Sequence, residues 1–192
     1  MLEYGRIKRE IYECLQNYSR ILQIPAPKLA FSSNKTFGGE YSKNLVTLNR
    51  LVIENWDNER KVCEFILVHE LIHAKYNESS IVVGLMSFFC PSVSVKLAFS
   101  ELRANTMAYE ITGSNESVLE HYFTNFYFYN KIPFISYSGG YLKGQEYVEF
   151  IRQHQKWTTQ TIENASIYFK NYCLWYKLVS LKKYLQIQQK FS

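Results

Sequence analysis

The segment Phe65–Asn77, "FILVHELIHAKYN", decides how the rest of the chain is interpreted. Two of the four histidines, His69 and His73, stand here around Glu70 in an otherwise apolar stretch. A buried imidazole needs a hydrogen-bond partner, and a buried carboxylate costs far more to bury. A core helix gains nothing from these residue types, so their presence indicates a function.

The spacing of the two histidines suits an α-helix that binds a metal ion. Positions i and i+4 share one helix face, so His69 and His73 can direct both imidazoles at one ion. Glu70 lies about 100° further round the helix, beside the ion. This H-E-x-x-H pattern predicts a Zn²⁺ site with two histidine ligands. Zinc lowers the pKa of a bound water toward about 7. Glu70 is then the catalytic base, which passes the proton to the leaving amine.

A catalytic zinc ion usually takes three protein ligands and one water, so a further ligand is expected. We predict that it is Glu101, on a second helix over residues 96–111. The 27 residues between His73 and Glu101 are enough for the chain to reverse direction. Asn105 follows one helical turn later and is expected to hydrogen-bond a ligand imidazole.

Other residues remain candidates for the third ligand or are set aside. Glu110, His121 and His154 are alternatives that no supporting pattern favours. Glu78 lies so close to His73 in sequence that we do not expect it to fold back onto the site.

Apolar periodicity and turn residues predict the other elements. A helix over residues 2–22 precedes two short strands in an antiparallel hairpin or meander, with a turn at "FGG". The motif helix spans residues 56–76, and Asp57 or Asn58 caps its start. The two expected strands span residues 28–33 and 45–49. After the motif helix we expect a buried helix or hairpin over residues 81–93, followed by helices over 96–111 and 116–130. Two more helices, divided near Asn164, are expected from residue 144 to the end.

Composition indicates one domain with a substantial core. The chain has 192 residues, of which 47% are hydrophobic, and a net charge of +5 that forms no basic stripe for nucleic acid. The charged N-terminal residues do not fit a signal peptide, and the scattered cysteines fit reduced thiols, so a cytoplasmic location is expected. The apolar run 81–93 is shorter than the roughly 20 residues of a membrane span.

"HELIH" followed by "ELRANTMAYEI" resembles the zinc metallopeptidases called gluzincins, in which a glutamate on a second helix completes the site. The spacing of Glu101, Ala104, Asn105 and Ala108 resembles the ImmA/IrrE type, compact bacterial and phage peptidases that cleave repressors. The upstream "GGEYSKNLVTLN" also resembles the strands before their zinc helix. The motifs are similar, too, to a family of mitochondrial processing peptidases, although its additional cysteines are missing here.

The resemblance implies an α+β, zincin-like fold in which a short twisted sheet packs on the helix of the motif. Residues of about 28–111 form its core, and about 116–192 add C-terminal helices to the single domain. The implied activity is zinc-dependent cleavage of a protein substrate such as a regulator or repressor, whose backbone pairs with the sheet edge. The oxyanion needs a stabilising group, for which the candidates are Tyr109, His121, Tyr122 and His154. The alternative is a zincin-fold binding or regulatory module whose peptidase activity is latent or lost.

Overall fold

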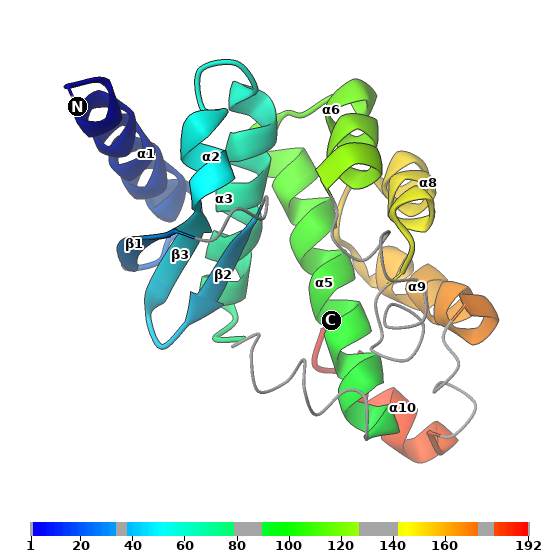
Figure 1. Ribbon diagram of the computed structural model, residues 1–192. Coiled ribbons are helices and arrows are strands. Elements are labelled where there is room, and N and C mark those ends of the chain that lie inside the picture. Colours follow the sequence, from blue (N-terminus) through cyan, green and yellow to red (C-terminus); the bar gives the residue numbers. More distant parts are fainter. Residues whose placement is uncertain (1, 34–37, 79–89, 127–141, 173–178, 192) are drawn as a thin grey trace.

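The computed structural model describes residues 2–33, 38–78, 90–126, 142–172 and 179–191. The protein has a mixed α+β fold, mostly helical, with one small open sheet of three strands (Figure 1). The N-terminal half contains the sheet and the first helices: α1 (Leu2–Ile21), β1 (Lys28–Ser32), β2 (Gly39–Ser42), β3 (Leu45–Asn49), α2 (Arg50–Glu54) and α3 (Arg60–Lys75). The C-terminal half is helical: α5 (Pro91–Thr112), α6 (Glu116–His121), the π-helix η1 (Tyr122–Phe126), α8 (Gly144–His154), α9 (Thr159–Tyr172) and α10 (Leu181–Gln188).

The sheet has the strand order β1-β3-β2. β2 and β3 form an antiparallel hairpin around Lys43 and Asn44, whose φ angles of 48° and 62° suit a primed two-residue turn. β1 pairs with β3 in parallel, however, so the predicted antiparallel arrangement is wrong for this strand. The "FGG" segment is not the hairpin turn either, because Gly39 already begins β2.

Helix α3 lies between the sheet and α5, as Figure 1 shows. It contacts β2 and β3 on one side and α5 on the other, and α1 packs along it as well. Ten of its side chains are buried, so this helix is apolar on nearly all sides. The histidines and the glutamate of the motif therefore stand in the middle of the molecule.

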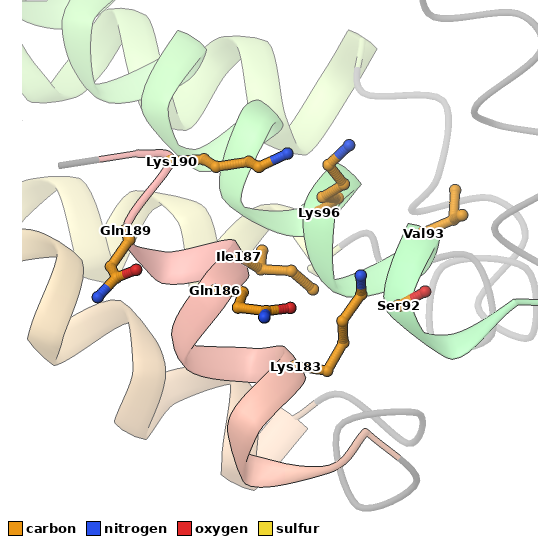
Figure 2. A pocket seen from close by; sticks show the side chains of 8 residues that line it. All are labelled: Ser92, Val93, Lys96, Lys183, Gln186, Ile187, Gln189 and Lys190. Atoms are coloured by element: carbon orange, nitrogen blue, oxygen red, sulfur yellow. The ribbon is translucent and has the colours of Figure 1, made fainter.

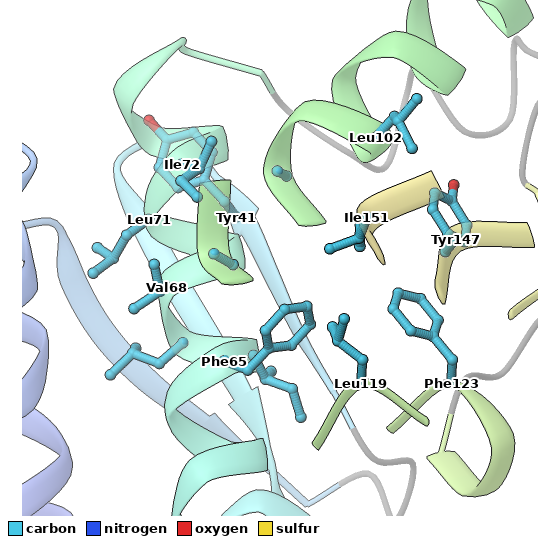
Figure 3. Packing of buried hydrophobic residues seen from close by; sticks show 14 of the residues in the cluster. Tyr41, Phe65, Val68, Leu71, Ile72, Leu102, Leu119, Phe123, Tyr147 and Ile151 are labelled. Atoms are coloured by element: carbon cyan, nitrogen blue, oxygen red, sulfur yellow. The ribbon is translucent and has the colours of Figure 1, made fainter. Parts of the chain in front are cut away.

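Aromatic side chains join α3 to the C-terminal helices. Phe65 on α3 contacts the rings of Tyr122 and Phe123, and Phe123 stacks on Tyr147 of α8 with centroids 5.2 Å apart. Figure 3 shows Phe65, Leu119, Phe123 and Tyr147 gathered in this region of the core. The hydrophobic core is thus continuous from the sheet to α8.

Several helix boundaries differ from those predicted. The motif helix starts at Arg60 and not at residue 56, its N-cap is Glu59, and neither predicted cap is used. The short helix α2 was not predicted. α5 begins earlier than expected, because Pro91 is well suited to the first turn of a helix.

The C-terminal region contains three described helices, where two were predicted. The first break falls between α8 and α9 and not near Asn164. Gln155 ends α8 with a positive φ of 36°, and no glycine stands there to indicate a helix end in the sequence. The helix predicted over 116–130 is α6 followed by η1, and its last residues lie outside the described part of the chain. The same holds for most of the apolar run 81–93.

None of the helices in the described ranges combines the length and hydropathy that a membrane crossing requires.

Candidate metal centre

The buried part of α3 presents His69, Glu70 and His73 toward β2 and α5. His73 is 3% exposed and Glu70 is 6% exposed, while His69 keeps some contact with solvent. Their neighbours on the helix, including Val68, Leu71 and Ile72, are completely buried. Packing of this apolar helix therefore carries the polar groups inside, and their mutual contacts must compensate for lost hydration.

Helix α5 supplies the groups that face the motif. Glu101 and Asn105 are one turn apart and both buried, as are Ala104 and Ala108, whose small side chains allow α5 to approach α3 closely. The helix ends at Gly113, whose φ of 58° is the left-handed conformation that glycine favours at a C-cap. One rigid helix thus presents both predicted residues to the two histidines.

Three potential ligand atoms converge between the helices. The Nε2 atoms of His69 and His73 are 3.0 Å apart. One Glu101 carboxylate oxygen lies 3.5 Å from Nε2 of His69, and the other lies 3.6 Å from Nε2 of His73. Zinc with bonds of about 2.1 Å and tetrahedral geometry separates its ligand atoms by about 3.4 Å. Among the described residues, these three form the one group that could hold a metal ion, and their separations fit zinc.

The hydrogen bonds of the imidazoles leave both Nε2 atoms free to bind an ion. Nδ1 of His69 donates to Oδ1 of Asn105 over 2.9 Å, the hydrogen bond expected from the sequence. Nδ1 of His73 faces Oε2 of Glu78 at 3.4 Å. Both partners are acceptors, so Nδ1 carries the proton in each neutral ring. Two Nε2 lone pairs then face each other and a carboxylate, an arrangement that a cation stabilises.

The charges around the cluster also favour a divalent cation. Glu70, Glu78 and Glu101 bring three carboxylates together, and Arg103 is the guanidinium that pairs with them, at Glu78. Burial lowers the pKa of His73, but the hydrogen bond that its imidazole donates to Glu78 and the charge of Glu101 outweigh burial and raise this pKa to about 9. The carboxylates around the cluster therefore favour a positive charge between the imidazole rings of His69 and His73.

Glu70 lies beside the cluster of His69, His73 and Glu101, and it packs closely against strand β2. Burial raises the pKa of its carboxyl group, although the two neighbouring imidazoles oppose the change. A Cβ atom on Gly39 would stand 2.9 Å from Cγ of Glu70 and 3.0 Å from Cδ2 of Leu48. These distances are shorter than ordinary contacts, so the absence of a side chain at position 39 sets where Glu70 lies.

We expect Gly39→Ala to reduce any activity that uses Glu70 by about 10- to 100-fold, because a displacement of about 1 Å at a reacting group has that effect. Metal content should not change, because the three atoms nearest to such a Cβ belong to Glu70, Leu48 and Thr47 and to none of the proposed ligands. Gly5→Ala on α1 is the matched control, since a Cβ there meets no atom within 4 Å. Equal activities of the two variants would contradict this role of Gly39.

The other sequence candidates lie outside the cluster. His121 pairs with Glu59 at 3.1 Å, near the start of α3, and His154 packs against Phe150. Glu110 lies 3.8 Å from the ammonium of Lys156. The structure thus brings together His69, His73 and Glu101 and leaves these three alternatives elsewhere.

Two of the candidate oxyanion stabilisers are the tyrosines Tyr109 and Tyr122. Tyr122 packs against Phe65, one helical turn before His69 on α3, which places its ring near the motif. Tyr109 is partly buried against the core, two turns beyond Glu101 along α5.

Sequence reasoning missed three supporting residues, Glu78, Ser100 and Arg103. The sequence analysis does not expect Glu78 to fold back onto the site, but Asn77 adopts a φ of 53° and the amide of Glu78 donates to the carbonyl of His73. Asn is among the few residues that tolerate this left-handed conformation, so Asn77 after the helix was the available signal. Ser100 and Arg103 carry no motif of their own.

A separate hollow of about 450 Å³ lies between the start of α5 and α10 (Figure 2). It is lined by Lys96, Lys183 and Lys190, with Ser92, Gln186 and aliphatic side chains between them. The described residues that line it include no carboxylate or imidazole, and so offer no group for acid–base chemistry at neutral pH. Its lysines are exposed, as expected for a solvated basic surface.

Comparison with known proteins finds no matching family model, no matching curated protein and no matching solved structure.

Proposed function

We propose that this protein is a zinc-dependent metallopeptidase of the gluzincin type with a zincin-like fold. The observation that carries the proposal is the convergence of His69, His73 and Glu101 on one point, with Glu70 buried beside them. A structural zinc site usually takes four protein ligands and has no use for an adjacent base. Within the described residues the group has three ligands, which suits an open position for water.

When bound at this cluster, zinc would acidify a coordinated water and polarise the substrate carbonyl. Glu70 accepts the proton of the attacking water at its carboxylate, while the water oxygen bonds to the carbonyl carbon. The same carboxyl group then donates this proton to the amide nitrogen as the C–N bond breaks. Burial, which raises the pKa of Glu70, favours a group that both accepts and donates a proton near neutral pH.

The edge of the sheet supports a peptide as the substrate. β2 is an outer strand, paired with β3 alone among the described strands, and it contacts α3. Gly39 on this strand touches Glu70. An extended peptide that pairs with the outer side of β2 would therefore pass close to the base, and its main chain would be held by hydrogen bonds. The substrate is accordingly a protein or peptide, such as the regulator that the sequence resemblance implies.

The second candidate is a zincin-fold binding module without peptidase activity. It is considered because aromatic residues of the C-terminal region cover part of α5, the helix that contributes Glu101. Phe99 of α5 contacts the rings of Phe169, Tyr184 and Phe191. These contacts lie on α5 and not on the imidazoles, and His69 retains contact with solvent. Solvent access to the cluster favours the peptidase.

Peptides from a tryptic digest of a cellular proteome provide a direct test. We expect the zinc-loaded protein to cleave a subset of them, the chelator-treated protein to cleave none, and added zinc to restore cleavage, as read by mass spectrometry. His69→Ala protein, purified in the same way, is the control for contaminating peptidases. Cleavage that persists after zinc removal would contradict a zinc peptidase, and failure of the zinc-loaded protein to cleave any peptide would favour the binding module.

A further inference from the structure

Glu78 is placed against a metal-ligand candidate by the turn that ends α3. The helix is capped at Tyr76, Asn77 adopts a left-handed conformation, and the amide of Glu78 donates to the carbonyl of His73 over 2.9 Å. The chain thereby turns back, and Oε2 of Glu78 comes to lie 3.4 Å from Nδ1 of His73. A carboxylate on the far nitrogen of a ligand histidine fixes the orientation of the ring and raises its basicity.

Glu78 is itself held by two residues of α5. The hydroxyl of Ser100 donates to Oε2 over 2.6 Å and also lies 3.3 Å from Nδ1 of His73. Nη2 of Arg103 donates to the other oxygen, Oε1, over 2.6 Å. Each carboxylate oxygen therefore has a partner on α5, so the position of Glu78 depends on where Arg103 lies.

Arg103 contacts two aromatic rings. Its guanidinium carbon lies 3.4 Å from the ring centroid of Tyr76 and 4.6 Å from that of Phe191. The side chain is buried, and its Nε has no hydrogen-bond partner among the described residues. The rings and Glu78 thus supply the contacts that fix this guanidinium, and a ring face attracts a cation most strongly where water is excluded.

Phe191 follows α10, and Figure 1 shows this end of the described chain beside α5. The ring of Phe191 stacks on Phe99 with centroids 5.3 Å apart, and its carbonyl accepts a hydrogen bond from Trp157. These contacts hold the segment firmly in place. Phe191 connects to the cluster through a continuous series of contacts: Arg103, then Glu78, then His73.

We propose that Phe191 is a positioning residue for the metal centre, which acts through Arg103 and Glu78 on the orientation of His73. The segment after α10 thereby tunes metal affinity without contacting the metal. This inference rests on the proposed zinc site, and it assigns the C-terminal region a role in that site. Any partner or covalent change that displaces Phe191 weakens metal binding from a distance.

The test measures zinc affinity by competition with a chromophoric chelator, and the visible spectrum of the cobalt-substituted protein reports ligand geometry. We expect Glu78→Gln to weaken zinc binding about 10- to 100-fold. Phe191→Leu keeps apolar bulk but removes the ring face, and we expect an about two- to tenfold loss with a shifted cobalt spectrum. Phe191→Tyr, which retains a ring, should bind zinc about as tightly as the wild type. Tyr76→Leu, which removes the other ring that contacts the guanidinium, weakens zinc binding as well.

A double-mutant cycle separates this coupling from a general loss of packing. In a Glu78→Gln background, Phe191→Leu should cause no further loss of zinc affinity, although it still lowers the melting temperature. Ile187→Ala on α10 is the control, because Ile187 is equally buried and should lower the melting temperature while leaving zinc affinity within about twofold.

The outcomes distinguish the two proposals. Wild-type protein that binds zinc, with Phe191→Leu protein that binds it equally well, overturns the role of Phe191 alone. Equal losses from Phe191→Leu in both backgrounds overturn the route through Glu78. Wild-type protein that takes up no zinc overturns the zinc site and this inference together.

Discussion

Glu70→Gln protein is expected to bind one zinc ion per chain and to lose at least about a thousandfold in kcat for peptide cleavage. The amide keeps the shape of the side chain but has no basic oxygen for the proton of the attacking water. Zinc is retained because the three converging ligand atoms belong to His69, His73 and Glu101. Metal analysis and single-turnover assays on a peptide found to be cleaved measure the two effects separately.

Glu64→Gln is a matched control for this experiment. Glu64 lies on the same helix, five residues before His69, and pairs with Arg60 at 2.9 Å. Its substitution should leave kcat within about twofold, because its partners Arg60, Lys61 and Tyr18 belong to no part of the proposed site. Activity retained in Glu70→Gln protein would refute Glu70 as the base, and loss of zinc would show that Glu70 serves as a ligand.

Glu101→Ala has the largest expected effect on metal content. Loss of one of three ligands should reduce zinc affinity by more than the roughly 100-fold typical of a residue that only supports a ligand. The purified variant should therefore contain little zinc and lack the zinc-dependent rise in melting temperature. That rise reflects about 2.7 kcal/mol in the wild type when free zinc is 100 times the Kd.

Metal-free Glu101→Ala protein is expected to be less stable than the metal-free wild type. Burial raises the pKa of the Glu101 carboxyl group, but the hydrogen bond from His69 and the charge of His73 outweigh burial and lower this pKa, so the substitution removes a favourable buried partner of the imidazoles. Glu110→Ala on the same helix is the control, and it also tests the alternative ligand, because Glu110 pairs with Lys156 on the surface. Normal zinc in Glu101→Ala protein, or zinc lost in Glu110→Ala protein, would contradict the assignment.

The arrangement around α3 and α5 was predictable because it depends on local periodicity. His69 and His73 share a face by virtue of their spacing, and Glu101 with Asn105 repeats the same geometry on the next strong helix. Apolar residues around both pairs indicate that the faces meet. The structure places these four residues together, although whether they bind zinc stays a prediction until metal is measured.

The features that differ from the predictions depend largely on backbone conformations that the residue types indicate weakly or not at all. Lys43, Asn77 and Gln155 adopt positive φ angles at three direction changes. Glycine is the strong signal for such positions. Asn77 is a weaker one, and Lys43 and Gln155 give none, so the sequence analysis does not predict the hairpin turn, the return of Glu78 or the end of α8. The parallel pairing of β1 with β3 depends on long-range packing, which a local pattern does not encode.

The division of the centre between α3 and α5 has a consequence during synthesis. A nascent chain that has emerged from the ribosome only as far as residue 90 contains the whole H-E-x-x-H sequence but lacks both residues that α5 contributes. Such a chain can chelate an ion only weakly, since two imidazoles are its sole ligands from this set. The proposed peptidase activity therefore has to wait until α5 has docked against α3, which delays any cleavage by the emerging chain.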